Sequence, residues 1–92
     1  MKDSFDWDIY SKIVASTYRS QIFLLLSKKS LSPKQISKRI DIAISHVSRT
    51  LSELEDLGLI TCLTSEEIKK GKIYTATEES KPYFNEIKKN LN

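Results

Sequence analysis

The residues best suited to chemistry in this sequence are short hydrogen-bonding side chains gathered in one stretch. They are Ser45, His46, Ser48, Arg49 and Ser52. An arginine can form two parallel hydrogen bonds to O6 and N7 of guanine, and a serine reaches a base edge or a phosphate without blocking close approach. The carboxylates Glu53, Glu55 and Asp56 follow directly and would repel phosphates. The pattern predicts that the N-terminal part of this stretch reads base edges in the DNA major groove.

The charge distribution supports an anionic partner. The chain carries a net charge of +3, but residues 28–49 hold six basic residues against one acidic residue, a balance of +5. The remaining nine basic and eleven acidic residues leave a balance of −2. A stripe of one sign creates a local field even in a nearly neutral molecule. A lysine-rich face that only keeps a small protein in solution would carry the same charges.

Two further groups of polar residues could contact the DNA backbone. The first precedes the base-reading stretch and comprises Ser32, Lys34, Gln35 and Lys38; these are expected to fix register on phosphates without reading sequence. The second comprises Lys69, Lys70 and Lys72, which would reach a flanking phosphate or the adjacent minor groove from the tip of a hairpin. Lysines at a hairpin tip can also serve only to solubilise it and to protect an edge strand.

The elements that must position these residues follow from periodicity and capping signals. Apolar spacing predicts a short helix near 6–15 and a longer one over 17–28, with one continuous helix as the alternative. Ser32-Pro33-Lys34-Gln35 is a capping box that starts the next helix. A turn over 41–44 then leads to a helix from Ser45 to about Leu57, in which Val47, Leu51 and Leu54 form the buried stripe. Gly58 is expected to end it in a left-handed conformation.

After Gly58 the pattern becomes extended. Residues 59–63 and 72–76 are short β-rich runs that predict a hairpin around a polar loop, in which Gly71 supplies a positive φ. Thr77 can cap a last helix, although Pro82 moves its expected start nearer Ser80. This order predicts a mainly α fold with a small β-hairpin: a winged helix-turn-helix, with the helix-turn-helix at about 32–57 and the wing at about 59–76.

Several runs of the sequence also resemble a known family. They are Tyr18-Arg19, Ser32-Pro33-Lys34-Gln35-Ile36, Ser45-His46-Val47-Ser48-Arg49-Thr50-Leu51, Leu54-Glu55-Asp56-Leu57-Gly58-Leu59-Ile60, Gly71-Lys72-Ile73-Tyr74 and Thr77-Glu78. Over roughly residues 16–80 the chain is similar to small archaeal winged-helix transcriptional regulators related to the ArsR and MarR groups. The resemblance implies sequence-specific DNA binding, commonly as a homodimer, to repress or activate transcription. It places Ser45, His46, Ser48 and Arg49 at base-reading positions.

The length and composition exclude several classes of function. A chain of 92 residues is expected to form a single domain over 1–92, which buries only about 60–65% of its unfolded surface and leaves little room for a substrate cleft. We therefore expect no enzyme. Cys62 and His46 are the only soft ligands and fall on different elements, so no metal or cofactor is expected. The absence of a long apolar run predicts a cytoplasmic protein associated with DNA.

For some residues the sequence is consistent with two different roles. His46 could contact a phosphate or a base, or could have a local capping or packing role, and Arg19 is expected to be a structural ion-pair partner. Apolar groups beyond the needs of a small core could form a homodimer interface or could cover the monomer's own core; they are Trp7, Tyr10, Val14, Phe23, Tyr83, Phe84 and Ile87. A winged helix can also act as a protein-binding adaptor without specific DNA binding, which is the alternative function.

Overall fold

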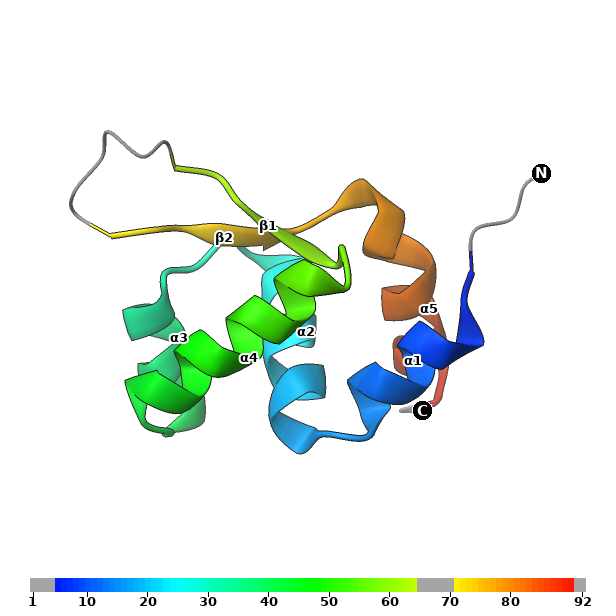
Figure 1. Cartoon of the computed structure of the whole chain (residues 1–92), viewed down its shortest axis with the longest axis horizontal. Coiled ribbons are helices and arrows are strands. Elements are labelled where there is room, and N and C mark those ends of the chain that lie inside the picture. Colours follow the sequence, from blue (N-terminus) through cyan, green and yellow to red (C-terminus); the bar gives the residue numbers. More distant parts are fainter. Residues whose placement is uncertain (1–4, 65–70, 91–92) are drawn as a thin grey trace.

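The computed structural model describes residues 5–64 and 71–90. Its elements run in the order α1 (Trp7–Val14), α2 (Thr17–Lys28), α3 (Pro33–Ile40), α4 (Ile44–Asp56), β1 (Ile60–Cys62), β2 (Tyr74–Ala76), a 3₁₀ turn η1 (Glu78–Ser80) and α5 (Lys81–Asn90). Figure 1 shows α3 at one end of the molecule and α1 with α5 at the other, with α2 and α4 between them. This arrangement confirms the predicted mainly α fold with a small β-hairpin.

Helix α2 is the centre of the packing. It contacts α1, α3, α4, α5 and β2. Its buried residues Ile22, Phe23 and Leu26 join the stripe of α4 formed by Val47, Leu51 and Leu54 in one apolar cluster. Phe23 is therefore a core residue of the monomer, and its inclusion among possible interface residues was wrong.

Side-chain caps explain why the first forty residues form three helices. Asp6 accepts a hydrogen bond from the Asp8 N–H, and Ser16 accepts one from the Arg19 N–H. The Ser16 cap begins a second helix two residues after α1 ends, so the alternative of one continuous helix is wrong. The capping box at Ser32 is confirmed, because Ser32 and Gln35 each accept a hydrogen bond from the other's backbone N–H.

The turn before α4 is shorter than predicted. Asp41 ends α3 in the left-handed region at φ 56°, which a short polar side chain tolerates better than most. Helix α4 begins at Ile44, one residue before the predicted start, and its N-cap Ala43 makes no side-chain capping bond. The tight turn, rather than a cap, sets this boundary.

Helix α4 ends as the sequence predicts. Gly58 has φ +78°, its N–H donates to the Glu55 carbonyl at 2.9 Å, and the Leu59 N–H donates to the Leu54 carbonyl at 3.0 Å. This pair of bonds is the Schellman motif. The Thr77 hydroxyl donates to the Gly58 carbonyl at 2.8 Å, so the same turn is joined to the segment that follows the hairpin.

The hairpin is anchored to the helices through its second strand. Strands β1 and β2 are antiparallel with Thr61 opposite Thr75. Leu31, in the connection between α2 and α3, forms a further bridge with Tyr74, whose N–H donates to the Leu31 carbonyl at 2.9 Å. The base of the wing and the start of α3 are therefore held together by backbone hydrogen bonds.

The last helix starts where Pro82 allows it. Thr77 precedes η1 but makes no side-chain capping bond there, which corrects its predicted role as a helix cap. Helix α5 begins at Lys81, so Pro82 lies in the first turn, where its missing N–H has no intrahelical partner to lose.

The left-handed turn at Gly58 gives a test of the fold. An added Cβ would meet no atom within 4 Å, so Gly58→Ala perturbs only the backbone. We expect Gly58→Ala to lower the free energy of unfolding by about 1–2 kcal/mol and Gly58→Asn to lower it by less, because asparagine tolerates the left-handed region. Urea unfolding of both variants measures this. Equal losses from Ala and Asn would show that backbone strain is not the cause.

The buried phenol of Tyr74 gives a second test. Burial raises the pKa of Tyr74 above its ordinary value; Lys72 opposes this shift, and Glu55 and Cys62 add to it. A raised pKa in the folded state means that this group's stabilising contribution is complete below pH about 10 and is lost as the pH rises through the folded pKa. We expect Tyr74→Phe to lose less unfolding free energy than the wild type between pH 9 and 11. Parallel alkaline losses in the two proteins would contradict the assignment.

Candidate nucleic-acid interface

The outward face of α4 carries three of the predicted base-reading residues. Ser45, Arg49 and Ser52 are all exposed and lie opposite the buried stripe of Val47, Leu51 and Leu54. At about 100° per residue these two sets occupy opposite sides of the helix. Because the apolar side of α4 is buried in the core, the side that carries the hydrogen-bonding residues faces solvent and is available to a partner.

One flank of α4 faces α3 and the wing. A concave surface there is lined by residues of α3, α4 and β2 with their adjoining segments: Ser32, Pro33, Lys34, Ile44, Ser48, Gly71, Lys72 and Tyr74. It brings the predicted base-reading Ser48 together with the predicted backbone contacts Ser32 and Lys34 and with the wing residue Lys72. Sequence reasoning placed these residues in three separate groups. The Leu31–Tyr74 bridge, which no short-range signal revealed, unites them.

The capping box determines which hydrogen-bonding groups of Ser32 and Gln35 remain available to a partner. The Ser32 hydroxyl oxygen accepts from the Gln35 N–H at 3.2 Å, and Gln35 Oε1 accepts from the Ser32 N–H at 2.9 Å. The Ser32 hydroxyl hydrogen and the Gln35 amide N–H groups remain as donors. Both groups are hydrogen-bond donors, and a phosphate oxygen is an acceptor, so each could bind the DNA backbone.

The lysines at this end are exposed. Lys34 and Lys38 lie one turn apart on α3, and neither forms an ion pair with any residue that the structure describes. Lys72 is exposed, and Gly71 beside it has φ +119°, which confirms the predicted positive φ. Lys69 and Lys70 lie outside the described residues.

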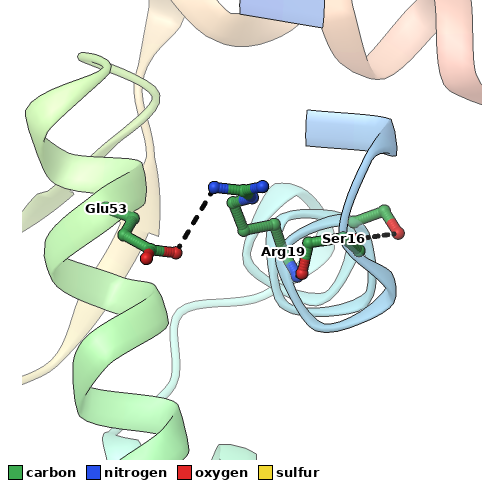
Figure 2. A network of polar contacts seen from close by, with 4 residues as sticks. Ser16, Arg19 and Glu53 are labelled. Atoms are coloured by element: carbon green, nitrogen blue, oxygen red, sulfur yellow. Dashed lines mark hydrogen bonds and ion pairs between the residues drawn. The ribbon is translucent and has the colours of Figure 1, made fainter. Parts of the chain in front are cut away.

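The opposite flank of α4 faces α2. The Tyr18 and His46 rings have centroids 5.9 Å apart, and Arg19 Nη1 lies 3.5 Å from Glu53 Oε1. Figure 2 shows Arg19 extending from α2 toward Glu53 on α4, close to the Ser16 cap. The expectation that Arg19 is a structural ion-pair partner is confirmed. Arg19 Nε is nevertheless buried without a hydrogen-bond partner among the residues that the structure describes, so within them the ion pair does not satisfy the whole guanidinium.

The soft ligands remain apart. Cys62 is half-buried on β1 with its sulfur 3.3 Å from Thr64 Oγ1, whereas His46 lies on α4. Over residues 5–64 and 71–90 no group of three or more His, Cys, Asp or Glu residues could hold a metal ion. In the same residues no helix is long and apolar enough to span a bilayer.

The apolar residues near the termini divide into two sets. Tyr83 and Ile87 are only 4% and 6% exposed and belong to the monomer core, so their inclusion among surface interface residues is corrected. Trp7 is 61% exposed and Val14 47% exposed, while Tyr10 and Phe84 are half-buried. Packing against the monomer's own core therefore accounts for the buried pair and leaves Trp7 and Val14 at the surface.

Tyr83 also organises the aromatic residues around it. The Asp6 N–H donates to the Tyr83 hydroxyl at 2.8 Å, and the Phe5 ring stacks on the Tyr83 ring at 4.6 Å. Trp7 in turn packs edge-on against Phe5 at 4.6 Å. The entry to α1 and the C-terminal helix are thus joined through one aromatic cluster.

Comparison with known proteins places the chain among helix-turn-helix proteins. A family model described as a helix-turn-helix domain matches residues 14–62, more than half of the chain. No curated protein sequence matches it. Residues 14–62 include α2, α3, α4 and β1, the elements that present the face described above.

Solved structures share the fold at low sequence identity. A variant of Lactococcus lactis ZitR in complex with DNA matches with TM-score 0.71 and 19% identity over 80% of this chain and 51% of that chain. The transcriptional regulator SlyA matches with TM-score 0.76 and 18% identity over 89% and 58% of the respective chains. HlyU from Vibrio cholerae matches with TM-score 0.72 and 21% identity over 95% and 97%. The chain thus spans about half of ZitR and nearly all of HlyU. It belongs to the helix-turn-helix domain family and has the winged-helix fold.

Proposed function

We propose that the protein is a sequence-specific double-stranded DNA-binding transcriptional regulator and has no enzymatic role. The observation that carries this proposal is the exposed face of α4, where Ser45, Arg49 and Ser52 lie opposite the buried stripe. In this arrangement α4 enters the major groove and Arg49 reads guanine through two parallel hydrogen bonds. Such a partner places the protein in the cytoplasm, at the DNA.

The flank toward α3 and the wing supplies the backbone contacts. Lys34 and Lys72 line one concave surface with Ser32 and Ser48, and Lys38 continues the cationic stripe along α3. Phosphate contacts fix the register of a protein on the duplex, while base contacts carry the sequence information. The wing then lies along the flanking backbone or the adjacent minor groove.

The composition of the α4 face favours DNA over a protein partner. A winged-helix adaptor would be expected to present an apolar or acidic face, whereas the outward side of the first turns of α4 carries hydroxyls and one guanidinium. The structural relatives support the same conclusion, since one is a transcriptional regulator and another was solved in complex with DNA.

Salt-dependent DNA binding tests the proposal. If about five phosphates are neutralised, log K for duplex DNA from the protein's own promoter region should fall with a slope of about −4 to −5 against log salt. Arg49→Ala should cost about 1–3 kcal/mol on the preferred duplex and little on a scrambled one. Lys34→Ala should weaken both duplexes alike and reduce the slope by about 1.

The matched control is Lys12→Ala, because Lys12 lies on α1 away from this face and pairs with Asp8. It should bind as the wild type does. No binding of the wild type to either duplex at low salt would overturn the proposed function. Equal losses on both duplexes from Arg49→Ala would show that Arg49 contacts only phosphate.

We also propose that the protein acts as a homodimer. The exposed Trp7 and Val14 lie on α1 with the half-buried Tyr10, whose ring centroid is 5.5 Å from that of Trp7, and the half-buried Phe84 lies on α5. Figure 1 shows α1 and α5 at the end of the molecule away from α3, so these residues offer apolar groups at that end. A two-fold pair would place two copies of α4 about 34 Å apart, one turn of DNA. Burial against a second copy would remove the Trp7 and Val14 side chains from water.

Sedimentation equilibrium tests the dimer. At tens of micromolar the wild type should have the mass of two chains, and Trp7→Lys should shift it toward one chain because a charge in an apolar contact is costly. Lys12→Ala, also on α1, serves as the control and should leave the mass unchanged. A monomer mass that is independent of concentration would rule out this proposal.

A further inference from the structure

Tyr18 is a large aromatic residue that the core leaves exposed. It lies in the first turn of α2 and is 39% exposed, although Ile22 and Phe23 on the same helix are fully buried. Its only described ring neighbour is His46 in the first turn of α4, with centroids 5.9 Å apart and planes inclined by 53°. An exposed tyrosine beside the outward face of α4 offers both a flat apolar surface and a hydroxyl to a partner.

The position of Tyr18 against α4 is well determined. The adjacent Arg19 is paired with Glu53 on α4, and Ser16 caps the turn that contains both residues (Figure 2). His46 and Glu53 are seven residues apart, so they lie on one side of α4 about two turns from each other. Two neighbouring residues of α2 therefore contact α4 at two points. These contacts fix the position of the Tyr18 ring along the axis of α4.

The α2 flank differs from the α3 flank in charge. On the α3 flank Lys34 and Lys72 can neutralise phosphate directly. On the α2 flank the cation Arg19 is already paired with Glu53, so these two charges largely offset each other. A phosphate that passes along this flank would therefore meet the neutral phenol of Tyr18 and the imidazole of His46 as hydrogen-bond donors.

We propose that Tyr18 is a DNA-backbone contact and the positioning residue for His46. The phenol hydroxyl donates to a phosphate oxygen of the strand that runs along the α2 flank, and the ring limits the rotamers of His46 so that its imidazole donates to the same stretch of backbone. Less side-chain freedom is then lost when DNA binds. This assignment rests on the proposed function and extends it to a residue outside the helix-turn-helix segment of 32–57.

Three variants separate the two parts of this role. Tyr18→Phe keeps the ring beside His46 but removes the hydroxyl, and we expect it to weaken DNA binding by about 10- to 150-fold, the loss of one hydrogen bond to a charged acceptor. Tyr18→Ala should weaken binding further. His46→Ala should cost less in the Tyr18→Ala background than in the wild type, because the ring that positions His46 is already gone.

Two readouts distinguish contact from a structural effect. The loss from Tyr18→Phe should be the same on preferred and scrambled duplexes, and the salt slope should stay at the wild-type value because no cation has been removed. Methylphosphonate substitution at the contacted phosphate should abolish the difference between wild type and Tyr18→Phe. The control is Ser27→Ala, which removes another hydroxyl of α2, one that donates to the Phe23 carbonyl at 2.9 Å, and it should leave DNA binding unchanged.

The outcomes separate this inference from the function on which it rests. If the wild type fails to bind DNA at low salt, the proposed function is overturned and this assignment falls with it. If the wild type binds and Tyr18→Phe binds equally well, only the role of the hydroxyl is overturned. Additive losses from Tyr18→Ala and His46→Ala would remove the positioning role.

Discussion

The packing of α2 against α4 is the interaction on which the rest of the structure depends. Each apolar side chain that this contact buries contributes about 1.5–3 kcal/mol. The partly exposed Arg19–Glu53 pair, by comparison, is worth about 0.2–1 kcal/mol. Burial therefore decides where α4 lies, and the ion pair only adjusts its alignment. Once Val47, Leu51 and Leu54 are in the core, the opposite face of α4 must point to solvent.

Burial of the apolar stripe fixes the rotation of α4 about its axis, and this rotation determines what lies on each of its two flanks. Ser48 is brought beside the start of α3 and the base of the wing, and His46 is brought beside the first turn of α2. The first flank carries the exposed lysines Lys34 and Lys72, whereas the second carries a cation already paired and an exposed phenol. In the proposed DNA complex, the two strands of the backbone beside α4 would meet different chemistry, which would give the helix a defined orientation in the groove.

Much of the fold could be predicted because its signals are local. The Ser32–Gln35 box, the Ser16 cap and the glycine at φ +78° each act over a few residues, and the helical period of Val47, Leu51 and Leu54 is visible without coordinates. Errors occurred where local signals compete with packing. Thr77 resembles a cap, but its hydroxyl bonds to the Gly58 carbonyl across the chain. Tyr83 and Ile87 resemble an exposed apolar stripe, but both belong to the buried core cluster, and the Phe5 ring stacks on Tyr83.

The sequence by itself determined the helix boundaries to within a residue or two and the polar composition of the α4 surface, because capping and periodicity depend on neighbours three or four positions away. Only the tertiary structure decided which distant side chains meet. Tyr18 reaches His46, Arg19 reaches Glu53, and Lys34 shares a surface with Lys72 because the crossing of α2 on α4 and the Leu31–Tyr74 bridge bring these segments together. Those crossings are set by the packing of the whole core, which no local spacing encodes.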